Sequence, residues 1–555
     1  MKSDLEVQKE IKLRNIKDVA KELDLSEDDL ELYGKYKAKI NDSILEKKNH
    51  NGKVVLVSAI TPTKAGEGKT TVSIGLAQAL RKLNVNVCLA LREPSLGPVM
   101  GLKGGATGGG YSQVVPMEDI NFHFTGDMHA LTSANNLVSA VIDNEIYYDS
   151  QLNIDPDRVV WARCLDVNDR ALRSVKIGQG SKFNGVERLD QFRITVATEL
   201  MAILCLSKDF KDLENRLNNA LVAYSKDGKE ILLKELNITG SLLLLLKEAF
   251  KPNLVQTTEG GPAIIHGGPF ANIAHGCNSI MATTYAKHLS DVVITEAGFG
   301  ADLGLEKFLD IKARISGIHP SACVLVATIR ALKMHGGVEL ENLKEENIEA
   351  MIKGCENLER HIETIKNFNL PFVVAINKFY TDTDKEIIAL EEYLKDKGYN
   401  FELADIHTNG GNGGIKLAER VLKVLNENKK DELHFLYETK DDIKDKILKI
   451  AKKAYGAGSV EYSPKALEKI ELYKKLGYSN LLICIAKTQN SVTDDSKILN
   501  APKDFTIHVK DVSLSLGAGF IVVYTGKIIT MPGLPIDPVC KHMGIDEDGN
   551  PFGII

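Results

Sequence analysis

Residues 53–71 read KVVLVSAITPTKAGEGKTT, and this stretch decides the fold. The apolar run Val54 to Ile60 predicts a buried strand, the glycine-rich segment after it a loop, and residues from about Thr70 to Arg81 a helix. A second apolar run, Val87 to Leu91, predicts the next strand. Strand, loop, helix and strand in this order form a βαβ unit, which requires a parallel sheet.

The same alternation continues along the chain and predicts an α/β protein. Further apolar runs have the length of buried strands: Val292 to Thr295, Cys323 to Thr328, Phe372 to Ile376, Leu481 to Ala486 and Phe520 to Tyr524. Helical patterns separate most of them. Residues 1 to about 50 also predict helix, because apolar residues recur there at helical spacing among charges. With 555 residues, the chain is expected to form two to four packed units.

The segment between the first strand and its helix has the features of a phosphate-binding loop. Gly66 and Gly68 allow backbone N–H groups to turn towards an anion, and Lys69 reaches the outer phosphates. The hydroxyl of Thr70 is expected to bind magnesium. A full Walker A pattern has glycine where this chain has Thr63, so the loop is a variant. The predicted ATP-binding residues are Thr63, Lys64, Ala65, Gly66, Glu67, Gly68, Lys69 and Thr70.

Composition and charge argue against several classes of function. The net charge is −6 and the short basic clusters alternate with acids, so no nucleic-acid partner is expected. The eight cysteines include no C-x-x-C pair, which argues against a zinc knuckle or a redox pair. The charged N-terminus lacks the apolar stretch of a signal peptide, and no apolar run is long enough to span a membrane. A cytoplasmic protein is expected.

Several long motifs follow one another along the chain: LREPSLGP at 91–98, KGGATGGGYSQVVP at 103–116, MEDINFHFTGDMHA at 117–130, PAIIHGGPFANIAHG at 262–276, TEAGFGADLG at 295–304 and AKTQ at 486–489. Together they closely resemble formate–tetrahydrofolate ligase over nearly the whole chain. The resemblance implies that formate attacks the γ-phosphate of ATP to give formyl phosphate and ADP. N10 of tetrahydrofolate then attacks the formyl carbon, giving 10-formyltetrahydrofolate and phosphate.

The resemblance also implies how the protein is organised. The family is a homotetramer that uses ATP with magnesium and is activated by monovalent cations, potassium or ammonium. By analogy, residues 1–125 and 284–357 form a P-loop-type nucleotide-binding domain with a parallel sheet. Residues 126–283 form an inserted α/β domain, and residues 358–555 form a third, C-terminal α/β domain that contributes to the folate site.

Arg92 and Lys69 are the predicted catalytic residues. Arg92 stands at the carboxyl end of the second strand, where open α/β sheets bind ligands. Its planar guanidinium can bind both carboxylate and phosphate. The family assigns the matching arginine to formate and formyl phosphate. The alternative for Arg92 is a structural salt bridge with Glu93 or another acid.

Glu93 and Asp127 match acids that the family places around the monovalent cation or the phosphates. The alternative is that they cap a helix or satisfy a loop. The run His123-x-x-x-Asp127-x-His129 could also be interpreted as a metal cluster, but magnesium on phosphates favours oxygen over imidazole, so a structural interpretation is favoured. The roles of His266 and His275 stay open.

For the folate, the resemblance implies a hydrophobic and aromatic slot around the pterin, formed by Phe299, Phe379, Leu403 and His407. The family pattern has tryptophan where this chain has His407, ahead of the glycines at 410–414. We therefore expect weaker folate binding with the same reaction. Each of these side chains, taken alone, would more often be a core residue than part of a ligand slot.

A second class of protein has some support, a P-loop nucleotide-switch ATPase or GTPase. The loop, with Lys64 ahead of its glycines, resembles that of partitioning ATPases, and Asn377-Lys378 is similar to the start of the guanine-reading N-K-x-D element. The fourth position, however, is Tyr380, so guanine would lack its carboxylate partner. The motifs at 117–130 and 262–276 have no evident use in a switch, which favours the ligase.

Overall fold

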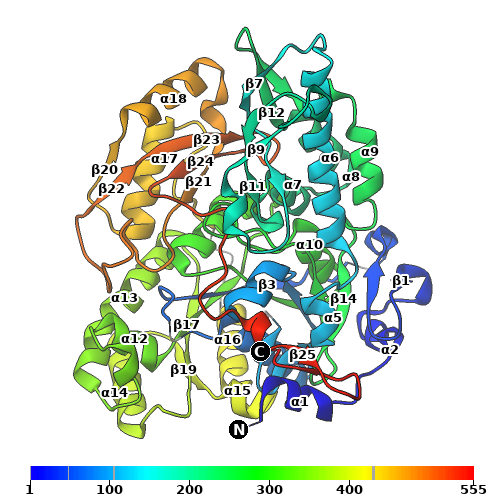
Figure 1. Ribbon diagram of the computed structural model, residues 1–555. Helices are drawn as coiled ribbons and strands as arrows, with labels where there is room; N and C mark the ends of the chain where they lie inside the picture. Colours follow the sequence, from blue (N-terminus) through cyan, green and yellow to red (C-terminus); the bar gives the residue numbers. More distant parts are fainter. Residues whose placement is uncertain (1, 48, 65, 104–106, 428–431, 555) are drawn as a thin grey trace.

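A computed structural model describes residues 2–47, 49–64, 66–103, 107–427 and 432–554. These residues form an α/β protein around one large sheet, so the predicted fold class is confirmed. Figure 1 shows the middle of the chain, in cyan and green, at the upper right and the C-terminal helices and strands, in orange, at the upper left. The red C-terminal segment then returns to the central part, where residues 539–541 pack against residues 99–103.

In the described part of the chain, the largest sheet has twelve strands, and its parallel portion runs in the order β15-β4-β16-β3-β17-β18-β19. These strands are β15 (Pro262–Ile265), β4 (Val87–Leu91), β16 (Val292–Glu296), β3 (Lys53–Ala59), β17 (Ala322–Ala327), β18 (Phe372–Asn377) and β19 (Phe401–Ala404). The parallel sheet that the βαβ unit requires is therefore confirmed. The carboxyl ends of these strands share one edge of the sheet, which is the usual place for a ligand.

Antiparallel strands extend the sheet beyond β15. They are β1 (Leu30–Leu32), β2 (Ala38–Ile40), β14 (Asn253–Thr257), β5 (Gly108–Gly109) and β6 (Ser112–Val115). The N-terminal hairpin of β1 and β2 joins the sheet because β2 pairs with β14. The expectation of helix over residues 1 to about 50 is therefore wrong beyond α1 (Asp4–Glu10) and α2 (Ile16–Ala20), because a distant strand supplies the hairpin with a hydrogen-bonding edge.

The two faces of β3 pack into different hydrophobic cores. Val55, Val57 and Ala59 belong to the core that includes α3 (Lys69–Lys82) and α16 (Ile415–Glu427). Val54 and Leu56 belong to the core on the other face, with α10 (Ile280–Leu289) and α13 (Ile348–Asn367). A strand that is buried on both faces has a continuous apolar sequence, which explains the run in residues 54–60.

The middle and C-terminal segments add smaller sheets and helices. The middle segment includes α6 (Asp127–Tyr147), α7 (Glu199–Leu206) and β12 (Leu221–Ser225). The C-terminal segment has a sheet of β21 (Leu482–Ala486), β24 (Phe520–Tyr524) and β23 (Asp511–Ser515), flanked by α17 (Ile443–Ile450) and α18 (Pro464–Lys475). The central sheet takes strands from all three predicted domains, since β14 and β15 lie within residues 126–283 and β18 and β19 within 358–555. The division into those domains stays a prediction.

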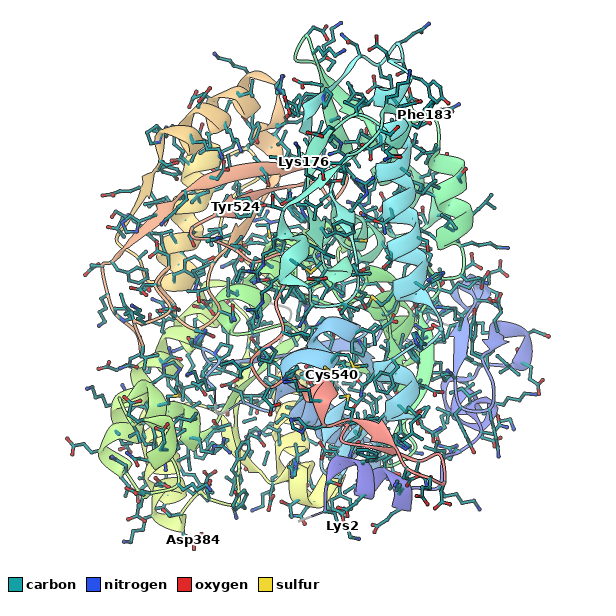
Figure 2. All side chains as sticks on the ribbon, viewed as in Figure 1. Lys2, Lys176, Phe183, Asp384, Tyr524 and Cys540 are labelled. Atoms are coloured by element: carbon teal, nitrogen blue, oxygen red, sulfur yellow. The ribbon has the colours of Figure 1, made fainter. Side chains whose placement is uncertain are left out.

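The cysteines behave as core residues. Every one is buried except Cys540, which lies close to the C-terminus of the chain (Figure 2). Burial raises the pKa of the Cys88 and Cys205 thiols, which makes both thiols unreactive. Among the described residues, none of the helices is both long enough and apolar enough to cross a membrane.

Candidate active site

The predicted phosphate loop lies between β3 and α3, and side chains hold it in shape. Gly66 and Gly68 have left-handed backbone, with φ of 76° and 72°, and a methyl group on Gly68 would lie 2.5 Å from Nδ2 of Asn377. Oε1 of Glu67 accepts the backbone N–H of Thr63 at 2.7 Å. Asn377 donates from Nδ2 to the carbonyl of Glu67 at 2.9 Å. The end of β18 therefore supports the loop.

Thr70 and Arg92 meet at one carboxylate, that of Glu296 at the end of β16. Oε2 of Glu296 accepts the Thr70 hydroxyl at 2.9 Å, and Oε1 lies 3.8 Å from Nη2 of Arg92. The Arg92 contact is too long for a hydrogen bond. Nε of Arg92 is buried and has no partner within the described residues. The salt-bridge partner is thus Glu296 rather than Glu93, and the guanidinium keeps hydrogen-bonding capacity for a ligand.

The other predicted loop residues have different positions. Lys69 opens α3 directly before Thr70, at the positive end of the helix. Lys64 is exposed in the loop, where a lysine can reach a bound anion. Ala65 lies outside the described residues.

A buried polar network holds the start of the loop at Thr61. The Thr61 carbonyl is hydrogen-bonded to Nε2 of His335 at 3.0 Å, and its hydroxyl lies 2.9 Å from Nε2 of His361 and accepts from Asn357 at 3.0 Å. Burial lowers the pKa of both His335 and His361 to about 4, so both rings are neutral at pH 7. This neutral network holds the start of the phosphate loop in position.

The segment 266–276 packs closely behind Arg92. A methyl group on Gly298 would lie 2.8 Å from Cβ of Ala271 and 2.9 Å from Nη1 of Arg92. His266 bonds to Ser279 and to the Ala249 carbonyl, each at 2.7 Å, which makes it a structural residue. Burial, reinforced by Lys312 and other nearby cations, lowers the pKa of His275 well below its ordinary value, so His275 is neutral.

Glu93 and Asp127 lie together, and a buried lysine, Lys39, forms an ion pair with Asp127. Lys39 in β2 donates to Oδ1 of Asp127 at 2.8 Å, to Asn253 at 2.9 Å and to the Lys251 carbonyl at 3.0 Å. The second oxygen of Asp127 accepts from Asn253 at 2.8 Å. Burial and the neighbouring Asp127 raise the pKa of Glu93 well above its ordinary value, and Oε2 of Glu93 has no partner within the described residues.

A cavity of about 220 Å³ opens beside this pair. His123, His129 and Asp166 line it together with Glu93 and Asp127. Burial raises the pKa of Asp166 to about 6, and this carboxylate accepts the Ser95 hydroxyl at 2.6 Å. No group of three or more histidine, cysteine or acidic residues in the described chain has an arrangement that could hold a metal ion.

Three of the predicted folate residues follow the carboxyl ends of strands, and the fourth lies within a strand. Phe299 follows β16 with a left-handed backbone, φ 61°, which is strained for an aromatic residue and typical of functional loops. Phe379 follows β18, and the Arg330 guanidinium lies 4.6 Å from its ring centroid. Leu403 lies in β19 and His407 in the short helix α15 (Ile406–Asn409). All four are half-buried at the same edge of the sheet.

His407 and the glycines after it are packed against other parts of the protein. The His407 carbonyl accepts the backbone N–H of Tyr111 at 3.0 Å, and its ring lies against Gly109 and Gly110. A methyl group on Gly411 would lie 2.9 Å from backbone of Gln78 in α3. Glycine is therefore required at 411 for close packing on α3, whatever this segment binds.

The end of β18 and the loop after it contain polar atoms that no group in the described part of the chain satisfies. Oδ1 of Asn377, Oγ1 of Thr381 and Oδ1 of Asp382 are all buried without a partner among the described residues. The other oxygen of Asp382 accepts the Phe379 N–H at 2.8 Å, and burial raises the pKa of Asp382 to about 6. Such groups usually have a partner, so this loop is a candidate contact for a polar ligand.

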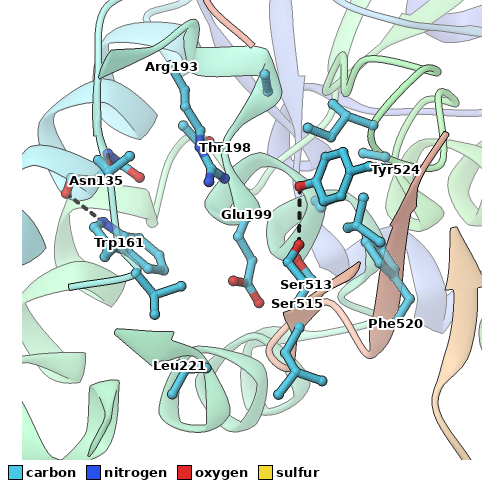
Figure 3. A pocket seen from close by; sticks show the side chains of 18 residues that line it. Asn135, Trp161, Arg193, Thr198, Glu199, Leu221, Ser513, Ser515, Phe520 and Tyr524 are labelled. Carbon is cyan, nitrogen blue, oxygen red and sulfur yellow. Dashed lines mark hydrogen bonds between the residues drawn. The ribbon is translucent and has the colours of Figure 1, made fainter. Parts of the chain in front are cut away.

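A separate small cavity, of about 60 Å³, lies away from the phosphate loop (Figure 3). Arg193, Glu199, Ser513 and Tyr524 are among the residues that line it, where α7 faces β23 and β24. Oε1 of Glu199 accepts the backbone N–H groups of Gly517 and Ala518 at 2.9 and 3.3 Å. The cavity therefore lies where α7, in the middle of the chain, packs against β23 and β24 near the C-terminus.

Glu199 is expected to make the stability of the folded protein depend on pH. Burial raises the pKa of Glu199 to about 7 from an ordinary 4.5. The folded protein therefore holds a proton there that the unfolded chain loses, so stability falls as pH rises from 4.5 to 7. Glu199→Gln keeps the hydrogen-bond acceptor but cannot ionise. The variant should therefore lose about 2–3 kcal/mol less stability than the wild type between pH 4.5 and 7. The melting temperature of each protein, measured against pH, checks this. Glu214→Gln, on the exposed face of α8 (Phe210–Asn219), is the control, and parallel profiles for all three proteins would contradict the assignment.

Sequence reasoning missed several residues that build the site. Glu296 and Asn377 stand in motifs that were recognised, and their place at the ends of buried strands was a usable signal. The sequence carries no such signal for the contacts of Thr61 with Asn357 and His361, because these contacts join residues about 300 positions apart. Lys39 was hidden in a segment expected to be helical.

A protein-family model matches the chain over this whole arrangement. The family model described as formate–tetrahydrofolate ligase matches residues 2–555. The match spans the phosphate loop, Arg92, Glu296 and the folate candidates alike.

Proposed function

The chain belongs to the formate–tetrahydrofolate ligase family, an ATP-dependent ligase family, and from this we propose a route for its reaction through formyl phosphate. Formate attacks the γ-phosphorus of ATP, bound on the 60–70 loop, and ADP leaves. N10 of tetrahydrofolate then attacks the formyl carbon, the carbon–oxygen bond to phosphate breaks, and N10 loses its proton. The observation that supports this most is the meeting of Thr70 and Arg92 at Glu296.

The roles follow from the chemistry of phosphoryl transfer, which needs positioning and charge stabilisation. Lys69, at the helix start, binds the outer phosphates, while Arg92 holds the formate carboxylate in line and stabilises charge on the transferred group. Magnesium prefers oxygen ligands, and Thr70 and Glu296 supply a hydroxyl and a carboxylate that would hold it. When bound, magnesium neutralises charge on the β- and γ-phosphates.

The monovalent cation is part of the same proposal. Oε2 of Glu93 is buried without a described partner, whereas both oxygens of Asp127 already accept hydrogen bonds. Of the two acids, Glu93 is therefore the one with an oxygen left for potassium or ammonium, and a bound cation would favour the ionised form of Glu93 that burial and Asp127 disfavour. The homotetramer, the cytoplasmic location and the P-loop type of the nucleotide domain also stay proposals. The family match does not favour a nucleotide switch.

An isotope experiment tests the intermediate. Formate labelled with ¹⁸O should transfer one labelled oxygen to the released phosphate, because the attacking oxygen stays on phosphorus when the carbon–oxygen bond breaks. Labelled oxygen released to water, with none in the phosphate, would exclude formyl phosphate.

His407 should limit folate affinity. A pterin next to an indole gains more flat contact than next to imidazole, and aromatic pairs contribute about 0.5–1.5 kcal/mol beyond area burial. His407→Trp should therefore lower the KM for tetrahydrofolate several-fold while kcat and the KM for ATP stay unchanged. His407→Ala is the matched control and should raise the KM. If both variants leave it unchanged, the 407–414 segment does not line the pterin slot.

A further inference from the structure

Two buried side chains, His335 and Asn357, join the start of the phosphate loop to a distant segment near residue 500. The Thr61 N–H donates to Oδ1 of Asn357 at 3.2 Å, and Nδ2 of Asn357 donates to the Asn500 carbonyl at 2.7 Å. The Asn500 N–H donates to Nδ1 of His335 at 3.2 Å, and Nε2 of His335 donates to the Thr61 carbonyl at 3.0 Å. These four hydrogen bonds form a closed ring that pairs the N–H and the carbonyl of both backbones.

The ring fixes the tautomer of His335. A backbone N–H can only donate and a carbonyl can only accept, so Nδ1 carries the lone pair and Nε2 carries the proton. Burial lowers the pKa of His335 to about 4, which keeps the imidazole neutral at pH 7. The side chain therefore bonds to one backbone through each nitrogen.

The helices that carry the two side chains are packed at backbone contact. His335 is the last residue of α12 (Ile329–His335), and Asn357 lies in α13. A methyl group on Gly354 in α13 would lie 1.9 Å from the Leu332 carbonyl oxygen in α12. No larger residue fits there, so the two helices hold the imidazole and the amide at a fixed spacing.

Thr61 needs these partners because strand pairing ends one residue earlier. The Ile60 N–H bonds to the Val326 carbonyl at 3.2 Å, and Thr61 then begins the turn into the phosphate loop, fully buried. At the other side of the ring, Asn500 has left-handed backbone, φ 64°, which asparagine tolerates better than most residues. Its side chain donates to Oε2 of Glu356 in α13 at 2.6 Å. Both backbones are thus held against α13.

We infer that His335 is a positioning residue for the nucleotide, because it holds Thr61, and with it the start of the phosphate loop, in one conformation before ATP binds. The inference rests on the proposed function, in which this loop binds ATP. A loop that already has its binding conformation loses less conformational freedom when the ligand arrives, so its affinity is higher. Formate and the folate are proposed to bind to other residues, so the effect of His335 should be confined to ATP.

Two variants of His335 provide the test. His335→Phe keeps a buried ring but removes both hydrogen bonds, whereas His335→Gln again offers one donor and one acceptor. His335→Phe should raise the KM for ATP, and the Kd for MgADP in calorimetry, about tenfold, the change that corresponds to one buried hydrogen bond. His335→Gln should recover most of this affinity. The KM values for formate and tetrahydrofolate should stay unchanged in both variants, and kcat at saturating ATP should be largely kept.

His288→Phe is the matched control. His288 is also buried and bonds through Nε2 to a backbone carbonyl, that of Lys47, at 3.1 Å. It lies at the end of α10, before the amino end of β16, whereas the phosphate loop follows the carboxyl end of the parallel neighbour β3. His288→Phe should lower the melting temperature and leave the affinity for MgADP unchanged.

Hydrogen exchange of the ligand-free proteins completes the test. In His335→Phe, the peptides that contain Thr61 and Asn500 should both exchange faster than in the wild type. Asn357→Leu breaks the other half of the ring and should give the same pattern, so the result does not depend on one variant folding. Wild-type affinity for MgADP in His335→Phe, or an equal loss in His335→Phe and His335→Gln, would overturn the inference. A wild type that does not bind MgADP would refute the proposed nucleotide site, and the exchange of the two peptides would still show whether His335 joins them.

Discussion

Arg92→Ala is expected to lower kcat by two to three orders of magnitude while the protein stays folded. The guanidinium lies beside the Thr70–Glu296 contact, and its Nε has no described protein partner. It is therefore placed to stabilise charge that shifts during phosphoryl transfer, and loss of such a group costs about 3–4 kcal/mol of barrier. Lys69→Ala should have a similar effect, since Lys69 opens α3 at the phosphate loop.

The control for both variants is Arg81→Ala at the other end of α3. Arg81 pairs with Glu22 and bonds to the Glu259 carbonyl, away from the loop. Its loss should leave kcat unchanged. Steady-state kinetics of the three variants measure kcat, and melting curves show whether each variant stays folded. A near-normal kcat for Arg92→Ala would contradict the catalytic role, and a lowered melting temperature beside it would make the contact with Glu296 structural.

Lys39→Met is expected to destabilise the protein by about 3–5 kcal/mol, because it leaves the carboxylate of Asp127 buried without its counter-charge. The Lys39 and Asp127 side chains are 0% and 5% exposed, and the ammonium makes three hydrogen bonds. A double variant with Asp127→Asn, which removes the charge, should recover much of the loss. Chemical denaturation midpoints measure both effects.

Lys37→Met is the matched control for this prediction. Lys37 lies two residues earlier in the chain and pairs with Asp119 at 2.9 Å, but the Asp119 carboxylate is 44% exposed. A pair with one partner in contact with solvent contributes about 0–1 kcal/mol. Equal losses for Lys37→Met and Lys39→Met would show that burial does not set the strength of the Lys39 pair.

The phosphate loop could be predicted from sequence because its signal is local. A continuous apolar run, two glycines and Gly-Lys-Thr stand next to one another, and β3, the loop and α3 follow in that order. The strand ends at 91, 296 and 377 could likewise be located from apolar runs. Parallel pairing then brings these ends to one edge, which explains why Arg92, directly after β4, lies near Glu296 and Thr70.

Contacts between distant segments could not be predicted. Thr70 bonds to Glu296 and Glu67 to Asn377, and no spacing rule connects such positions. The β1–β2 hairpin has three residues in each strand, and it depends on β14 rather than on its own propensity. The role of Lys39 could not be predicted for the same reason, because its partners Asp127 and Asn253 come from other elements.

One assay tests the central claim most directly. ADP and 10-formyltetrahydrofolate are measured together with ATP, formate and tetrahydrofolate all present, and again with each omitted in turn. The account predicts that both products form at equal rates in the complete mixture and that sustained ADP release stops when formate or the folate is missing. ADP released at the full rate without formate, or with no formylated folate, would contradict the assignment of this site to formate–tetrahydrofolate ligation.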